Sequence, residues 1–92
     1  MHYLYIIYST EADKYYVGET SDMERRIKEH ITGAFKGSFT GRARDWELRL
    51  RIEFDDINKA RKAEAFIKRM NSRKFIERLI EDSDWLKIKF NC

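Results

Sequence analysis

The chain has 92 residues, of which 42% are hydrophobic and 38% charged, and its formal net charge at pH 7 is +3. This composition excludes a disordered chain and a membrane-spanning one, and the length fits a single domain over residues 1–92. The small positive charge is compatible with a nucleic-acid partner, but many inert domains carry as much. Cys92 is the only cysteine, which excludes an internal disulfide, and with no signal-peptide pattern we expect a cytoplasmic protein.

The first elements are predicted to be two paired strands. Tyr3–Tyr8 is apolar at every position, which is typical of a strand covered on both faces. Ser9–Asp13 is polar and predicts a hairpin loop. Tyr15–Val17 follows as the return strand, which we expect to end at Gly18.

A helix is predicted next, capped by Ser21 or Asp22 and running to about Thr32. Its apolar stripe would consist of Met23, Ile27 and Ile31. The following segment, Gly33–Arg44, is rich in glycine and basic residues and predicts a surface loop. Its cations Lys36, Arg42 and Arg44, with Phe39 among them, could follow a phosphate backbone, although a solvated loop explains them equally well.

Trp46–Phe54 alternates between apolar and charged residues, which predicts a third strand with Trp46, Leu48, Leu50, Ile52 and Phe54 on one face. Asp55 or Asp56 would cap a second helix, and Ser72 a third. The apolar positions of these helices are Ile57, Ala60, Ala63, Ile67 and Met70, then Phe75, Ile76, Leu79 and Ile80. Trp85–Phe90 predicts a short final strand. The expected fold is therefore a small α/β (α+β) domain, with a three-stranded antiparallel sheet and about three flanking helices.

Tyr5 and Tyr16 lie on the two strands of the predicted hairpin. If they pair opposite each other, both hydroxyls leave the same face of the sheet and can reach one substrate group. Gly18, two residues after Tyr16, would leave open space beside it. The alternative is that both tyrosines are core aromatics.

Arg26 and His30 are four residues apart and share one helix face. A phosphodiester-cleaving site needs a cation against the developing charge and a nearby group for proton transfer, and these two residues meet both needs. The alternative is a solvated basic helix, in which Arg26 pairs with Asp22 and His30 caps.

Glu64 breaks the apolar stripe of the second predicted helix, because the helical period turns it inward between Ala60 and Ile67. A carboxylate at the edge of a core, facing tyrosines and an arginine, suits a hard divalent cation. The alternative is an ordinary ion pair with Lys68, four residues later.

The spacing of these residues resembles that of the GIY-YIG nuclease family, in the form of its small stand-alone members. The resemblance covers about residues 3–80 and leaves 81–92 outside. It rests on Tyr3-Leu4-Tyr5, on Tyr16-Val17-Gly18, on the segment from Gly18 to His30, on Ser38-Phe39-Thr40 through Leu48, and on Ala60 to Lys68. Each segment is weak by itself, but the combination is specific.

The resemblance implies a Mg²⁺- or Mn²⁺-dependent endonuclease that cleaves DNA. Tyr16 would be the general base or orient the water, Tyr5 would assist it, and Arg26 would stabilise the transition-state charge. His30 would aid proton transfer and Glu64 would hold the metal. A minimal domain of this kind could rely on a protein partner for DNA targeting. The alternative is a nucleic-acid-binding module that keeps the fold without turnover.

Overall fold

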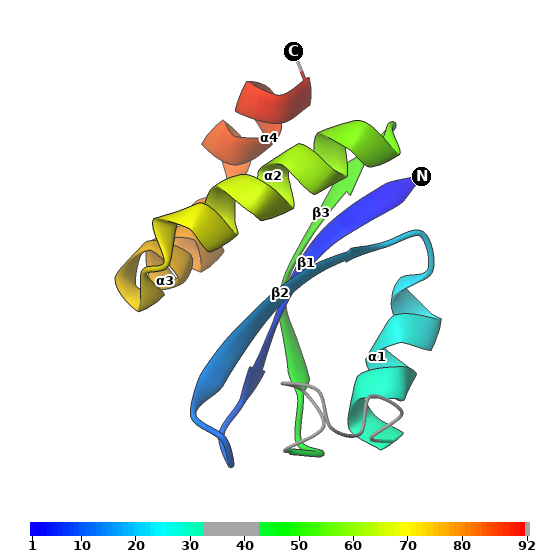
Figure 1. Ribbon diagram of the computed structural model, residues 1–92, viewed down its shortest axis with the longest axis vertical. Coiled ribbons are helices and arrows are strands. Elements are labelled where there is room, and N and C mark those ends of the chain that lie inside the picture. The colour runs from blue at the N-terminus through cyan, green and yellow to red at the C-terminus, as the bar shows by residue number, and fades with distance from the viewer. Residues whose placement is uncertain (33–42, 92) are drawn as a thin grey trace.

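A three-stranded antiparallel sheet forms the centre of the protein in the computed structural model, which describes residues 1–32 and 43–91 (Figure 1). The strands are β1 (His2–Ser9), β2 (Lys14–Thr20) and β3 (Glu47–Phe54). Because the strand order is β2-β1-β3, β1 is covered by a strand on each side and β2 is an edge strand. This sheet confirms the predicted α/β class.

Helices cover both faces of the sheet (Figure 1). The described part of the chain contains α1 (Met23–Thr32), α2 (Ile57–Met70), α3 (Arg73–Glu81) and α4 (Asp84–Asn91). The helix α1 lies on one face, and α2 packs on the other face together with α3 and α4. The helix count is therefore one higher than expected. Among the described residues, no helix has the length and apolar character needed to cross a bilayer.

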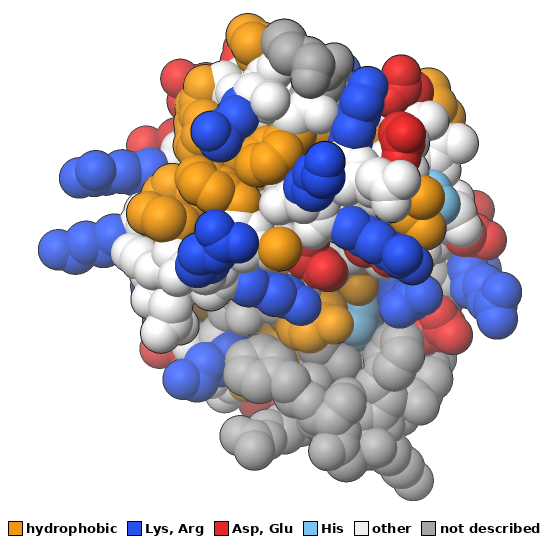
Figure 2. Space-filling view, turned by 45° about the horizontal axis from the view of Figure 1, so that its top comes forward, with side chains coloured by type: hydrophobic (Ala, Val, Ile, Leu, Met, Phe, Trp, Pro, Cys, Tyr) orange, Lys and Arg blue, Asp and Glu red, His pale blue; other side chains and the backbone are white. Residues whose placement is uncertain are grey.

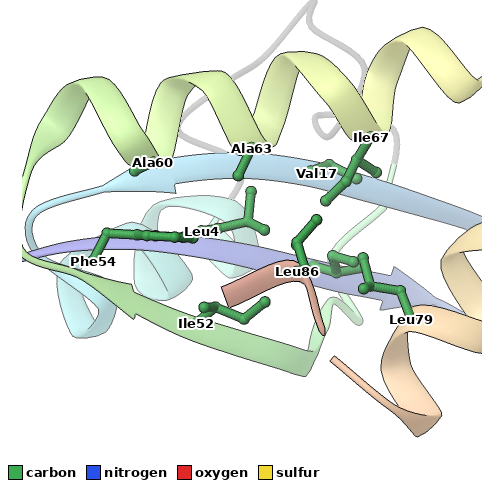
Figure 3. Close-up of a cluster of buried hydrophobic side chains, with 10 residues drawn as sticks. Leu4, Val17, Ile52, Phe54, Ala60, Ala63, Ile67, Leu79 and Leu86 are labelled. Atoms are coloured by element: carbon green, nitrogen blue, oxygen red, sulfur yellow. The ribbon is translucent and has the colours of Figure 1, made fainter. Parts of the chain in front are cut away.

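The larger core lies between the sheet and α2 (Figure 3). Ala60, Ala63 and Ile67 point from α2 toward Leu4 and Val17, and all five side chains are buried. The two alanines lack long side chains, so the helix backbone can approach the sheet closely. This close approach brings the rest of α2 near the edge strand β2.

A smaller core lies between the sheet and α1. Its buried residues are Tyr5, Ile7, Met23, Ala43 and Trp46. Alternate residues of β1 therefore serve the two cores, as the continuous apolar pattern of this strand predicts.

The predicted single apolar face of β3 is wrong. A register shift lies between Ile6 and Ile7, since Ile6 pairs with Leu50 whereas Ile7 pairs with Leu48. Such a bulge reverses the side-chain alternation of the strand. Trp46 consequently packs in the core that faces α1, and Leu48 is 43% exposed.

The end of β2 and the last apolar positions of two helices also differ from the prediction. The strand β2 continues past Gly18 to Thr20, because Tyr3 still pairs with Thr20. Ile31 and Met70, the last positions of two predicted apolar stripes, are 42% and 46% exposed. In α1 the buried position is His30 rather than Ile31, because the helix turns this residue toward the sheet.

The tail forms the helix α4 and not the predicted strand. Leu86 is fully buried against α2 and β3, and Phe90, four residues later, packs on the same core. A spacing of four residues fits one face of a helix or of a strand, but a strand would also place Ile88 on that face, and Ile88 is 65% exposed, as a helix requires. Trp85 adds an edge contact to Phe66, with ring centroids 6.3 Å apart.

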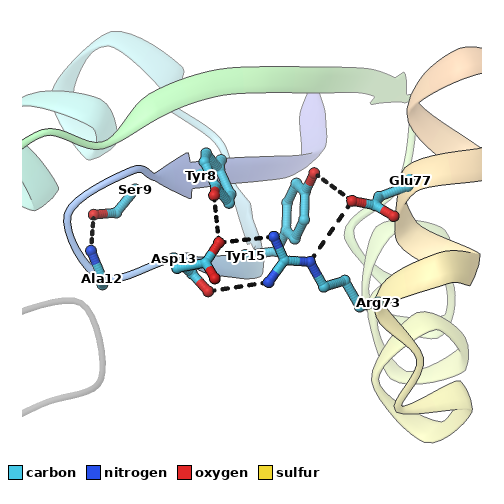
Figure 4. A network of polar contacts seen from close by, with 7 residues as sticks. All are labelled: Tyr8, Ser9, Ala12, Asp13, Tyr15, Arg73 and Glu77. Carbon is cyan, nitrogen blue, oxygen red and sulfur yellow. Dashed lines mark hydrogen bonds and ion pairs between the residues drawn. The ribbon is translucent and has the colours of Figure 1, made fainter.

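Arg73 fastens the β1–β2 hairpin to α3 (Figure 4). Its guanidinium donates to the Asp13 carboxylate at 2.8 Å and to the Asp13 carbonyl at 3.2 Å. It also lies 3.6 Å from the Glu77 carboxylate and over the rings of Tyr8 and Tyr15. These contacts hold the start of β2 at a fixed place beside α3.

Candidate active site

Gly18 gives Tyr5 room to reach the edge of the sheet. The two residues are paired across β1 and β2, and a Cβ atom at position 18 would lie only 2.5 Å from the Tyr5 hydroxyl oxygen. The ring therefore occupies the place of the missing side chain, and Tyr5 is only 1% exposed. The space predicted beside Tyr16 is therefore not open, because the Tyr5 ring fills it, and Tyr5 stands opposite Gly18 and not opposite Tyr16.

Tyr16 lies on the same face as Tyr5, as predicted. It pairs with Ile7, two residues along the ladder from the Tyr5–Gly18 pair, and the centroids of the two tyrosine rings are 6.3 Å apart. Unlike Tyr5, it is partly exposed. Of the two hydroxyls, that of Tyr16 belongs to the more accessible side chain.

His30 reaches the tyrosines from α1 and is 2% exposed. Its Nε2 atom lies 2.9 Å from the Tyr5 hydroxyl oxygen, and its ring centroid is 5.3 Å from that of Tyr16. Burial, reinforced by the charge of Arg26 against the weaker effect of Glu29, lowers the pKa of His30 to about 4. The imidazole is therefore neutral at pH 7.

Arg26 stands one turn before His30 on α1. Its Nε atom lies 3.4 Å from a Glu29 carboxylate oxygen, and 36% of its side chain is exposed. The predicted alternative partner, Asp22, instead caps the helix by accepting from the Arg25 backbone N–H at 3.1 Å. Arg26 is also close enough to Tyr5 to lower the pKa of the Tyr5 hydroxyl.

Glu64 comes to Tyr5 from α2, on the other side of the sheet, at the β2 edge. Its side chain is 23% exposed, and Lys68 Nζ lies 3.6 Å from its carboxylate. Burial, followed by Tyr16 and then Glu64, raises the pKa of Tyr5 well above its ordinary range, although Arg26 opposes the change. The structure thus brings the five predicted residues to one region of the protein, and we call this set the tyrosine patch.

The oxygen donors of the tyrosine patch determine which kind of metal site it could form. Glu64 is the carboxylate of the patch, and the described residues contain no cluster of three His, Cys, Asp or Glu side chains that could cage a metal. Mg²⁺ binds through one or two carboxylates and otherwise keeps water and substrate phosphate oxygens. The donor set fits an ion anchored by Glu64 and completed by water and phosphate, and does not fit a cage made by the protein alone.

A groove of about 480 Å³ begins at the tyrosine patch and runs between β2 and the α2–α3 corner. We call it the β2 groove; its lining includes Lys14, Tyr16, Lys68, Asn71 and Arg73. Tyr16 thus belongs to both the groove and the patch. Lys68 lines the groove beside it, with its Nζ atom 5.6 Å from the Tyr16 ring centroid. On the face shown in Figure 2, Lys and Arg side chains cover more surface than Asp and Glu side chains do.

Most of the predicted basic loop falls outside the part of the chain that the structure describes. Lys36, Phe39 and Arg42 lie there, whereas Arg44 is described and is exposed beside the buried Ala43. The predicted phosphate contacts of this loop therefore stay a prediction.

The sequence analysis did not predict where Lys68 lies, because it considered this lysine only as an ion-pair partner of Glu64. Its position four residues after Glu64 was the signal that could have found it, since residues at this spacing share a helix face. A cation on the same face as an inward-turned carboxylate lies near whatever that carboxylate faces.

A family model described as the GIY-YIG catalytic domain matches residues 1–76. A UPF0213 protein of Cupriavidus necator is 40% identical over 72 residues, which make up 76% of this chain and 74% of that protein. An uncharacterized protein of Acanthamoeba polyphaga mimivirus is 30% identical over 90 residues, 95% of this chain. The chain spans only 54% of the length of this viral relative. No solved structure matches the chain significantly.

Proposed function

The chain belongs to the GIY-YIG nuclease family, and we propose that it is a metal-dependent endonuclease that hydrolyses DNA phosphodiester bonds. The observation that carries the proposal is the gathering of Tyr5, Tyr16, Arg26, His30 and Glu64 from both layers of the fold in one region of the protein. Two of these side chains come from the strands, two from α1 and one from α2. A purely structural core has no need for an arginine, a histidine and a carboxylate at this point.

The two tyrosines have different roles in the proposal. Tyr5 is buried and its pKa is raised, so it keeps its proton and cannot serve as a base. Tyr16 is partly exposed and lines the β2 groove, where a substrate can reach it. Tyr16 is therefore the residue that orients the attacking water or accepts its proton, and the neighbouring Tyr5 assists it.

His30 maintains this arrangement as a neutral ring. Since its pKa is about 4, it is an acceptor at neutral pH, and the protonated Tyr5 hydroxyl can donate to its Nε2 atom. This hydrogen bond fixes the position of the Tyr5 hydroxyl near Tyr16. The contribution of His30 to proton transfer is thus to hold the tyrosine network in one orientation.

Arg26 supplies positive charge on the α1 side of the tyrosine patch. Its guanidinium pairs with Glu29 and remains partly exposed, so a substrate phosphate could share it. Fixed cations that face the developing phosphate charge stabilise the transition state in phosphoryl chemistry.

Glu64 is the residue that would hold Mg²⁺ or Mn²⁺ in this proposal. A bound ion of this kind acts as a Lewis acid and helps the leaving oxygen depart. The basic residues Lys36, Arg42 and Arg44 would contact phosphates away from the cut, and a protein partner could supply further targeting.

The test is to incubate the purified protein with single-stranded, duplex and branched DNA in Mg²⁺, Mn²⁺ or EDTA. We expect cleavage of at least one form with metal, none in EDTA, and none with Glu64→Ala. Glu81→Ala is a matched control because Glu81 is exposed on α3, away from the patch. If the protein binds DNA but cleaves none of these forms under any of the conditions, the proposed enzyme is wrong and the alternative holds, a catalytically inactive binding module.

A further inference from the structure

Lys68 lies between the tyrosine patch and the β2 groove. Its Nζ atom is 3.6 Å from the Glu64 carboxylate and 5.6 Å from the Tyr16 ring centroid. The same side chain lines the groove and is 51% exposed. One ammonium group is therefore within reach of the proposed metal-holding carboxylate, of the proposed base and of the path along which a nucleic-acid strand could enter.

The pair formed by Lys68 differs from the other Lys–carboxylate pairs of the same spacing among the described residues. The acidic partners of Lys28 and Lys59 have side chains that are 85% and 69% exposed, against 23% for Glu64. A pair between exposed groups contributes little, because water screens it. The Glu64 carboxylate is more enclosed, so it gains more from a neutralising cation.

We propose that Lys68 neutralises Glu64 in the resting protein and binds the substrate phosphate once a divalent ion takes its place at that carboxylate. The inference rests on the proposed function. An ammonium group and a divalent cation compete for one carboxylate, and the higher charge is favoured. The displaced ammonium is already beside Tyr16 at the mouth of the β2 groove, and lysine binds phosphate as a point charge.

The first half of the proposal is tested by metal binding in the absence of nucleic acid. Mn²⁺ affinity is measured by titration calorimetry for the wild type, Lys68→Met, Lys59→Met and Glu64→Gln. We expect Lys68→Met to tighten Mn²⁺ binding by about fivefold, because the competitor is gone, and Glu64→Gln to abolish it. Lys59→Met removes the same charge and the same kind of pair from α2, so it should change the affinity by much less.

The second half is tested by a double-mutant cycle in EDTA, where no ion can contribute. The probe is a fluorescein-labelled DNA oligonucleotide, used as a single strand and as a duplex, with affinity read from anisotropy. Glu64→Gln should raise the affinity by about threefold in the wild-type background, since it frees Lys68 for phosphate. In the Lys68→Met background the same change should have a smaller effect, whereas the Lys59→Met background should preserve it.

The outcomes separate this inference from the function on which it rests. If Mn²⁺ binds through Glu64 but Lys68→Met leaves its affinity unchanged, the proposed competition is wrong while the metal site stands. If Glu64→Gln raises DNA affinity equally in both Lys68 backgrounds, simple repulsion explains it, and the proposed phosphate contact is wrong. If the wild type binds no Mn²⁺, both the metal site and the role of Lys68 are overturned. Far-ultraviolet circular dichroism of each variant checks that α2 remains folded.

Discussion

Tyr5 and Gly18 face each other across the β1–β2 ladder, and the Tyr5 ring fills the volume that a side chain at position 18 would occupy. This relationship lets a buried residue of the central strand present its hydroxyl at the edge of the sheet. There it contacts His30 from one helix layer and is influenced by the charge of Glu64 from the other. The glycine is therefore part of the site although it contributes no functional group.

Gly18→Ala should destabilise the protein and disturb the patch. The added methyl group would lie 2.5 Å from the Tyr5 hydroxyl oxygen, and a ring that is 1% exposed has little room to move. We expect a loss of about 1–3 kcal/mol in the free energy of unfolding, measured with urea. The same substitution in a Tyr5→Leu background should cost less, because the clashing ring is gone. An equal cost in both backgrounds would show that the ring is not what Gly18 accommodates.

Tyr16→Phe should remove most of the cleavage activity while leaving the fold intact. Loss of a group that takes part in proton transfer costs about 10²–10⁴ in rate. Tyr5→Phe should cost less, because Tyr5 positions the network and keeps its proton. Tyr8→Phe serves as the control, since the Tyr8 hydroxyl donates to Asp13 and Tyr8 belongs neither to the patch nor to the lining of the β2 groove. Single-turnover rates compare the variants, and a larger loss for Tyr5→Phe than for Tyr16→Phe would reverse the assigned roles.

The buried neutral His30 should make stability fall in weakly acidic solution. Its pKa is lowered from 6.5 to about 4 in the folded protein, so the unfolded chain binds a proton first as pH falls. This contribution is complete above pH 6.5 and is lost as pH falls toward 4. The expected decline is on the order of 3 kcal/mol, since one pKa unit corresponds to about 1.4 kcal/mol.

Urea unfolding at several pH values between these limits measures this decline. The His30→Phe variant should show a flatter profile, whereas His2→Gln, which changes the other histidine, should keep the wild-type slope. A wild-type profile that is flat over this range would mean that His30 protonates freely in the folded protein.

The basic loop should govern the salt dependence of DNA binding. If Lys36, Arg42 and Arg44 contact phosphates, replacing all three by alanine should lower the slope of log affinity against log salt by about 2–3. Replacing Lys62, Lys74 and Lys87, which are exposed on helices, is the matched control. An unchanged slope in the loop variant would place the DNA-binding surface elsewhere.

Most of the fold was predictable from local pattern. The strands β1 and β3, the helix α2 and the cap at Ser72 follow from burial period and capping chemistry alone. The bulge opposite Ile6 and Ile7 was not predictable, because a change of register depends on the partner strand and does not alter the alternating sequence pattern of β3. The tail was ambiguous for a related reason, since Leu86 and Phe90 fit both a strand and a helix face.

The members of the tyrosine patch were predictable individually, but their arrangement was not. Glu64 stood out because it interrupts an apolar stripe, and His30 because it shares a face with Arg26. The burial of His30 against Tyr5 depends on how α1 is rotated about its axis over the sheet. The exposed Ile31 shows that the predicted rotation was wrong by one residue. The spacing of Lys68 from Glu64 indicated a shared helix face, but its position in the β2 groove depends on how α2 overlaps the β2 edge.

The most direct test of the central claim is a comparison of cleavage and binding in Glu64→Gln. As the carboxylate of the patch, Glu64 is the proposed anchor for the metal ion, so its loss should lower the cleavage rate by on the order of a thousandfold. DNA affinity should be kept or slightly raised, because the substitution frees Lys68 from its carboxylate partner, and circular dichroism should show an intact fold. A variant that cleaves at the wild-type rate would contradict the account, and one that unfolds would show that Glu64 serves mainly as the structural partner of Lys68.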